Sequence, residues 1–141
     1  MANYIATART NYFKVTDEDK YNEWFSKLWA EDTIQDFTET KEDGTILDGF
    51  GSYAPIDFTG YHFDDDEEIE KEIDLIPELQ ELLPDGEAFI YLEAGNEKLR
   101  YVIGYALIVT NAEARGVDLD VVAEEVAKEL VGEDFNTKLS Y

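Results

Sequence analysis

The chain contains no cysteine, and it has only one histidine and three prolines among 141 residues. Without cysteine there can be no disulfide, no thiolate metal site and no thiol catalysis. A Ser-His-Asp triad would depend on His62 alone, and no G-x-S-x-G motif is present. No apolar run approaches the ~18 residues of a membrane-spanning helix. These absences predict no catalytic residue, no cofactor and no membrane partner.

Basic residues are also scarce, because 11 lysines and arginines stand against 34 acids and give a net charge of −23. Contacts to phosphates need Lys and Arg, so direct nucleic-acid binding is not expected. An anionic membrane would repel such a chain. The first thirteen residues are neither basic nor continuously apolar, which does not fit a secretory signal. We therefore expect a cytoplasmic protein.

What the chain does have is enough apolar material for a core. Hydrophobic residues make up 44% and aromatic residues 13% of the sequence, which argues against disorder despite the charge. The length suits one domain. We predict a single α+β domain over residues 1–132 and a C-terminal tail over 133–141.

Alternation and helical periodicity predict the element order β-α-β-β-α-β-β-α. We expect about five strands in a mainly antiparallel sheet, with two to three helices. The strands are predicted over residues 3–15, 33–40, 45–53, 87–94 and 98–110. The helices are predicted over about 13 residues after an N-cap at Thr16, over 76–83, and over 119–130.

Apolar stripes indicate how the helices pack. Tyr21, Trp24, Phe25 and Leu28 follow at helical spacing and are expected to face the core. The last helix should be capped by Asp118 and ended by Gly132. Small residues at 104 and 106 should let a helix lie close to the strand over 98–110. The inward stripe of the last helix is predicted to be Leu119, Val122, Ala123, Val126, Ala127 and Leu130.

Turns and irregular segments complete this picture. Residues 41–44 predict a hairpin turn with Gly44 at positive φ, and Gly49 and Gly51 suggest a bulge or a close backbone approach. Residues 54–65 read as a connection. The aromatic residues within it either pack on the core or form a contact surface, and they are Phe58, Tyr61, His62 and Phe63.

The most charged stretch runs from Asp64 to Glu81 and contains one base, Lys71. Pro77 allows either one kinked helix or an extended acidic segment followed by a short helix, and we prefer the second. A calcium-binding loop starting at Asp64 fails, because its sixth and twelfth positions are Ile69 and Leu75. No metal site is therefore predicted. The predicted partner-binding residues are Asp64, Asp65, Asp66, Glu67, Glu68, Glu70 and Glu72.

The charge is comparable with that of DNA. A compact chain of this length spans roughly 35–40 Å. Duplex DNA carries one charge per ~1.7 Å, so an equal length holds on the order of 22 charges. An acidic surface of this density could occupy a site that normally holds nucleic acid.

Two segments carry a resemblance. Residues 4–13 (YIATARTNYF) and the later Glu97-Lys98-Leu99-Arg100-Tyr101 followed by Gly104-Tyr105 resemble a family of small proteins carried by mobile elements and phages of gut Firmicutes. The likeness covers most of the chain, but its motifs imply no reaction and no site residue. In size and acidity the chain is also similar to anti-CRISPR and anti-restriction proteins, several of which mimic DNA.

These observations predict an inhibitor rather than an enzyme. The expected partner is a basic nucleic-acid-binding protein, with a Cas9-type CRISPR effector preferred, whose Arg and Lys side chains would meet the carboxylates. One alternative is an interaction or regulatory domain of a mobile element that is acidic only for solubility. Another is a small hydrolase that uses two carboxylates about 5–9 Å apart. An uneven distribution of acids over the folded surface would favour mimicry over solubility.

Overall fold

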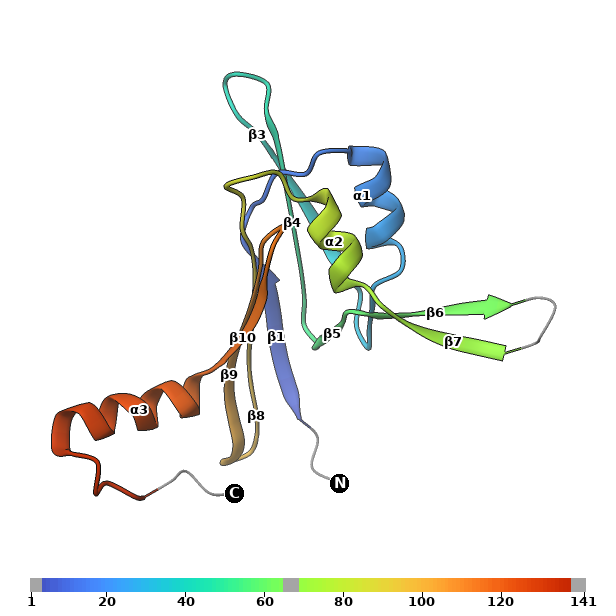
Figure 1. Cartoon of the computed structure of the whole chain (residues 1–141). Helices are drawn as coiled ribbons and strands as arrows, with labels where there is room; N and C mark the ends of the chain where they lie inside the picture. The colour runs from blue at the N-terminus through green and yellow to red at the C-terminus, as the bar shows by residue number, and fades with distance from the viewer. Residues whose placement is uncertain (1–3, 65–68, 138–141) are drawn as a thin grey trace.

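A six-stranded antiparallel sheet forms the centre of the molecule (Figure 1). The computed structural model describes residues 4–64 and 69–137. This arrangement confirms the predicted α+β fold and its mainly antiparallel sheet, with six strands rather than about five. The added strand, β10, was not predicted. The spatial order is β10 (Ala114–Asp118), β9 (Arg100–Val109), β8 (Phe89–Glu97), β1 (Ile5–Thr10), β4 (Ile46–Ser52) and β3 (Gln35–Thr40).

Two helices, α1 (Glu18–Phe25) and α2 (Ile76–Leu82), lie side by side on one side of this sheet (Figure 1). The indole N–H of Trp24 joins them by donating to the Leu75 carbonyl just before α2, at 2.8 Å. The third helix, α3 (Leu119–Val131), projects away from the body. Of the three helices in the described residues, α1 and α2 contribute buried residues to the core and α3 contributes none.

Aromatic rings fill the space between the sheet and the helix pair. Phe13 meets Phe89 nearly edge to face, with ring centroids 5.1 Å apart. Trp24 and Phe50 are also fully buried. Phe58 packs against this cluster, so one aromatic residue of the predicted 54–65 connection belongs to the core. The side chains of the other three lie outside the described residues.

The first helix is shorter than predicted. Its N-cap is Asp17, not Thr16, because the Asp17 carboxylate accepts from the Lys20 N–H at 3.1 Å. The Thr16 N–H instead donates to the Leu82 carbonyl at 2.8 Å. At the other end the Ser26 hydroxyl donates to the Glu23 carbonyl at 2.6 Å, a local bond that favours helix termination. The predicted 13 residues are therefore eight.

Residues 54–65 are not the simple connection that we predicted. They form β5 (Ile56–Asp57), which pairs with β2 (Trp29–Ala30), and β6 (Thr59–Asp64), which pairs with β7 (Ile69–Asp74). Both pairs are antiparallel and separate from the main sheet. Pro55 and Gly60 interrupt the apolar pattern here, which explains why the strands were missed.

Several local predictions are confirmed. Gly44 has φ +88° in the hairpin turn, and Pro77 lies in the first turn of α2. Gly132 ends α3, and its N–H donates to the Lys128 carbonyl at 2.8 Å. A Cβ on Gly51 would lie 2.8 Å from the Ala8 carbonyl oxygen, which is the expected close backbone approach.

The two faces of the sheet differ in cover. Along β1, Ala6, Ala8 and Thr10 are buried, whereas the alternate residues are exposed. The register carries this alternation into β8, β9 and β10. We call the exposed side of these four strands the outer face.

Candidate protein-binding site

Three of the seven predicted acidic residues lie on the paired strands β6 and β7, which project from the body on the side opposite α3 (Figure 1). Asp64 is the last residue of β6, and Glu70 and Glu72 lie in β7. In the register Phe63 is opposite Glu70, and Tyr61 is opposite Glu72. Asp65, Asp66, Glu67 and Glu68 lie outside the described residues. The described part of the acidic segment before α2, which is β7, is extended as we preferred, and it pairs with β6.

A cleft of about 940 Å³ adjoins the base of this hairpin. Trp29 of β2 and Tyr53 after β4 are largely exposed in it. The carboxylates of Glu31, Asp32 and Asp57 line the same cleft. Aromatic faces and carboxylates both attract cations, so this cleft suits an ammonium or guanidinium group. Sequence reasoning missed it because β2 and β5, which form its floor, come together only in the fold.

A tyrosine pair anchors this side of the sheet. The hydroxyls of Tyr91 and Tyr4 donate to the two carboxylate oxygens of Glu93 at 2.7 and 3.1 Å. The Tyr91 hydroxyl also accepts from the Ile56 N–H at 3.0 Å, which fixes β5 to the main sheet. Burial, followed by the bond to Glu93 and its charge, raises the pKa of Tyr4 to about 12. The two tyrosine hydroxyls hold the cleft in shape and stay neutral at physiological pH, because burial raises the pKa of both.

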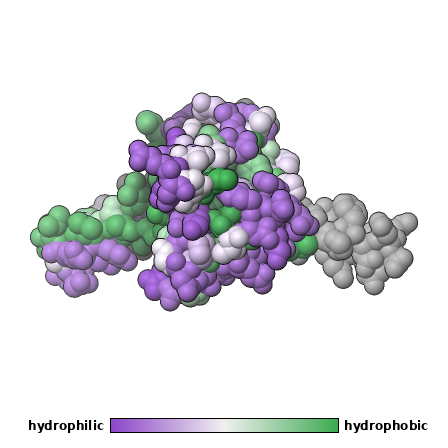
Figure 2. All heavy atoms as spheres, turned by 90° about the horizontal axis from the view of Figure 1, so that it is seen from above, coloured by the Kyte–Doolittle hydropathy of each residue, from purple (hydrophilic) through white to green (hydrophobic). Residues whose placement is uncertain are grey.

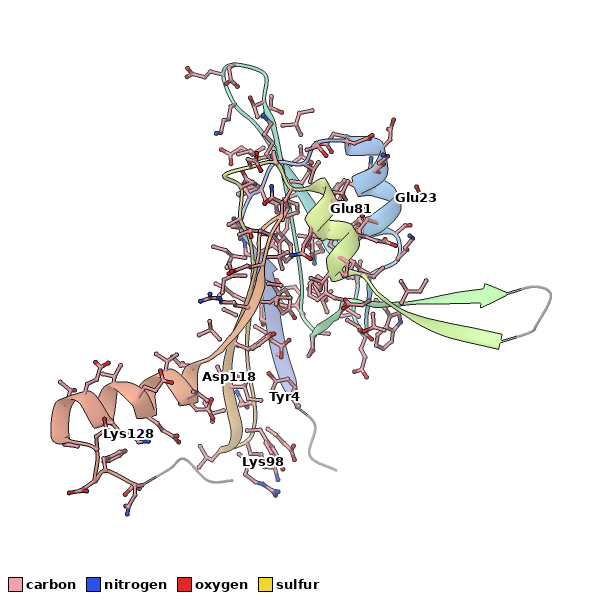
Figure 3. The ribbon with its side chains drawn as sticks, viewed as in Figure 1. Tyr4, Glu23, Glu81, Lys98, Asp118 and Lys128 are labelled. Carbon is pink, nitrogen blue, oxygen red and sulfur yellow. The ribbon has the colours of Figure 1, made fainter. Side chains whose placement is uncertain are left out.

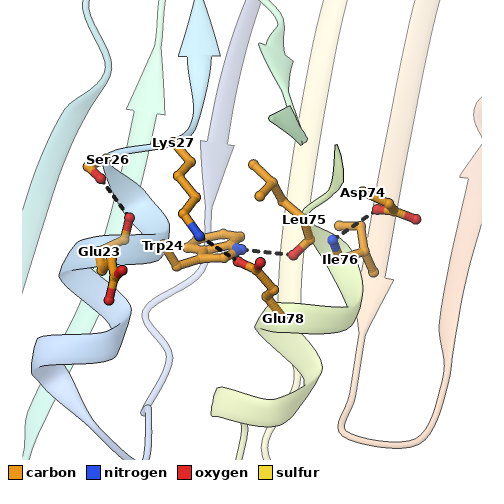
Figure 4. A network of polar contacts seen from close by, with 8 residues as sticks. All are labelled: Glu23, Trp24, Ser26, Lys27, Asp74, Leu75, Ile76 and Glu78. Atoms are coloured by element: carbon orange, nitrogen blue, oxygen red, sulfur yellow. Dashed lines mark hydrogen bonds and ion pairs between the residues drawn. The ribbon is translucent and has the colours of Figure 1, made fainter. Parts of the chain in front are cut away.

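The helix pair presents a second acidic surface (Figure 4). The Lys27 ammonium donates to Glu78 across α1 and α2 at 3.2 Å. Figure 3 shows Glu23 on α1 and Glu81 on α2, at the opposite end of the molecule from Asp118, the last residue of β10, and Lys128 of α3. A hollow of about 470 Å³ between the helices is lined by four acids, Asp17, Glu23, Glu78 and Glu81, and two lysines.

One pair of carboxyl groups is close enough to share a proton. The Glu18 carboxyl is hydrogen-bonded to Asp48, and burial, this bond and nearby negative charge raise the pKa of Glu18 to about 7. Burial also raises the pKa of Asp48. The hydrogen bond from Glu18 lowers this pKa, and the negative charge of Asp36 raises it. Asp48 is buried. We interpret this pair as a protonated Glu18 that donates to the Asp48 carboxylate.

This pair does not have the geometry expected of a two-carboxylate glycosidase. Such enzymes hold the carboxyl groups about 5 Å or more apart, so that the substrate lies between them. Direct hydrogen bonding between Glu18 and Asp48 leaves no such space. Among the described residues, no three His, Asp or Glu side chains are grouped so that they could hold a metal ion.

Most carboxylates of the described residues have no basic partner nearby. Among the described side chains, which are those of residues 4–60 and 73–137, the ion pairs within 4 Å are Lys27–Glu78 and Arg115–Glu113. The chain has 34 acids, so its negative field is not cancelled internally. That field is therefore available to an external cation.

The outer face, by contrast, carries no acid at its described positions. One row across β1, β8, β9 and β10 consists of Arg9, Leu92, Ala106 and Val117. The neighbouring row contains Thr7, Ala94 and Gly104. The carboxylates are thus distributed unevenly: they lie on the helix pair, the hairpins, the cleft and the polar side of α3, and they are absent from the described positions of the outer face.

No family model, no curated protein and no solved structure matches the chain. In the part of the chain that the structure describes, none of the helices has the length and apolar character needed to cross a membrane.

Proposed function

We propose that the protein binds a basic nucleic-acid-binding protein and blocks the site where that partner holds nucleic acid. The preferred target is a CRISPR effector of the Cas9 type, whose positively charged channel holds an A-form heteroduplex. Carboxylates would pair there with the Arg and Lys side chains that otherwise meet phosphates. The protein acts by occupancy and catalyses no reaction.

One observation carries this proposal: a strongly acidic chain has two ion pairs among its described side chains, and the outer face of β1, β8, β9 and β10 has no acid at its described positions. Acidity needed only for solubility has no reason to avoid a particular face. Uncancelled charge on one side speeds association with an oppositely charged protein and makes binding salt-dependent.

The β6–β7 hairpin and the adjoining cleft are the proposed contact region. The hairpin extends from the body, so it can enter a channel that the sheet could not. The cleft beside it supplies exposed aromatic faces for a guanidinium or ammonium group. Together they combine long-range attraction with a specific short-range contact.

The test measures binding to purified Cas9-type effector over a salt series from about 50 to 500 mM, a range over which screening changes strongly. In the test variant all five acids at 64–68 become the corresponding amides. A matched control has the same net charge but changes acids of the β3–β4 hairpin and the C-terminal region. Its changes are Glu39→Gln, Glu42→Gln, Glu125→Gln, Glu129→Gln and Glu133→Gln.

We expect the hairpin variant to lose at least tenfold more affinity than the control, and the wild-type affinity to fall steeply with salt. Equal losses in both variants would mean that total charge matters and the hairpin does not. Binding without a salt slope, or no binding to any basic nucleic-acid enzyme, would leave the domain acidic for solubility only.

A further inference from the structure

Helix α3 has an apolar stripe that the described residues leave exposed. The stripe was predicted to face inward, but none of the residues of α3 is buried. Val126 is 43% and Leu130 is 79% exposed. Figure 2 shows the apolar atoms as a band along one side of the projecting helix, with polar atoms along the other. The predicted amphipathic pattern is present, and its predicted burial within the chain is wrong.

Only the first turn of α3 packs on the sheet. A Cβ on Gly104 would lie 2.9 Å from Leu119 Cδ2, so the start of the helix rests directly on β9. This contact confirms that the small residue at 104 lets a helix lie close. Beyond it, α3 leaves the sheet (Figure 1). A helix of 13 residues is marginal in water without packing, so its exposed stripe needs a partner.

A complementary surface lies beside it on the outer face. An open trough of about 460 Å³ has small residues on its floor, chiefly Ala94, Gly104 and Ala106. Its walls include Leu92, and Leu119 from the first turn of α3. Small residues on the floor allow a helix backbone to approach, and aliphatic walls suit an aliphatic stripe. The apolar surface is thus continuous from the trough to the helix.

We propose that two copies of this chain associate through their outer faces, with α3 of each copy lying in the trough of the other. The α3 of a copy points away from its own trough, so it cannot fill that trough without leaving its contact with β9. Stripe and trough occur on the same chain, so a twofold axis satisfies both surfaces twice in one isologous interface.

Exposed apolar residues occur on both α3 and the outer face. A standard interface buries roughly 800 Å² on each partner, and these residues are available to contribute to it. Those that expose more than a third of their surface are Ile5, Leu92, Val102, Val117, Leu119, Val121, Val122, Val126, Leu130 and Val131.

The charge distribution selects a second copy as the occupant. Two chains of net charge −23 repel each other, and the acid-free outer face is the described surface where they can approach with least repulsion. Arg9 and Arg115 lie on this face, and the polar side of α3 carries acids such as Glu125 and Glu129. Salt screens the overall repulsion, so association should strengthen with salt. The proposed binding of a basic partner has the opposite salt dependence.

Sedimentation equilibrium of the full chain from about 1 to 200 µM, at 50 and 500 mM NaCl, tests the proposal over a wide range of screening. The mass should rise from 16.1 kDa towards twice that value, and at lower concentration in high salt. Val126→Asn in α3 and Ala106→Gln on the trough floor should each weaken association at least tenfold. Ile46→Asn is the matched control, because Ile46 is 42% exposed and lies in the separate β3–β4 hairpin.

Circular dichroism of each variant establishes that it is folded, and the two interface variants lie on different elements. A mass of 16.1 kDa at every concentration and salt would overturn the proposal. The proposal would also be overturned if Val126→Asn and Ala106→Gln weakened the dimer no more than Ile46→Asn does, because the interface would then lie elsewhere.

Discussion

The two faces of the central sheet differ in burial and in charge. Under α1 and α2, aromatic rings are buried completely, and carboxylates crowd the surface above them. On the outer face the rows across four strands contain no acid, are mainly apolar and remain exposed or half-buried. One side therefore has a buried core beneath an acidic surface, and the other has apolar surface that no helix pair covers. The net charge of −23 is a sum over the whole chain, so it does not show how charge differs between the two faces.

The two faces should differ most in the free energy of unfolding that is lost when a large side chain is replaced by alanine. Trp24→Ala should destabilise the protein by about 4 kcal/mol, because it leaves a large cavity and removes the bond to Leu75. Leu92→Ala on the outer face should cost less than about 1 kcal/mol, since little buried contact is lost. The exposed fractions are 2% for Trp24 and 56% for Leu92. Urea unfolding at low micromolar concentration measures both, and similar losses would contradict the description of an open outer face.

Glycines offer a finer comparison within the sheet. Gly51→Ala should cost about 2 kcal/mol, because the added Cβ would lie 2.8 Å from the Ala8 carbonyl and the β1–β4 pairing would have to move. Gly104→Ala should cost less than about 1 kcal/mol, since its nearest contact is the end of the flexible Leu119 side chain. Thermal unfolding would rank the two, and a reversed order would mean that α3 is held more rigidly than β4.

The carboxyl pair on the acidic side predicts a pH effect. Glu18 has a folded pKa of about 7, above its ordinary value, so it stabilises the fold at low pH, and that contribution is lost as pH rises from about 4.5 through 7. Glu18→Gln keeps a donor towards Asp48 and cannot ionise. After allowance for solvent screening, the variant should be more stable than wild type by about 1 kcal/mol at pH 8.

Unfolding free energies at pH 5 and pH 8 provide the measurement, with Glu23→Gln as the control for loss of one exposed acid from the same helix. The gain for Glu18→Gln should appear at pH 8 and not at pH 5. An equal gain from Glu23→Gln would attribute the effect to general repulsion and not to the pair.

The sequence was informative where a local pattern determines the structure. The stripe of Tyr21 and Trp24, the turn at Gly44 and the helix end at Gly132 depend on near neighbours, and all three were predicted correctly. The stripe of α3 was predicted correctly as a pattern and incorrectly as a contact. Periodicity shows that one helix face is apolar, but it does not show which surface covers that face.

Features that join distant segments could not be derived from the sequence. Glu18 and Asp48 are separated by thirty residues, and nothing distinguishes them among 34 acids before β4 is placed beside α1. The cleft needs β2 paired with β5, and strands of two residues leave no alternation to detect. β10 was missed for a similar reason, since its five residues are all exposed and include Gly116.

Ion pairs give the smallest and most specific comparison of the two sides. In a double-mutant cycle, Lys27–Glu78 on the acidic side should show a coupling of about 0.5 kcal/mol at 50 mM salt, because the pair bridges two packed helices. Arg115–Glu113 at the outer-face edge is more exposed and should show a coupling close to zero. Both couplings should vanish near 0.5 M salt as screening increases. If the Lys27–Glu78 coupling persisted at that salt, the helix pair would hold its charges in a drier environment than their exposure indicates, and the acidic side would be less available to a partner than we propose.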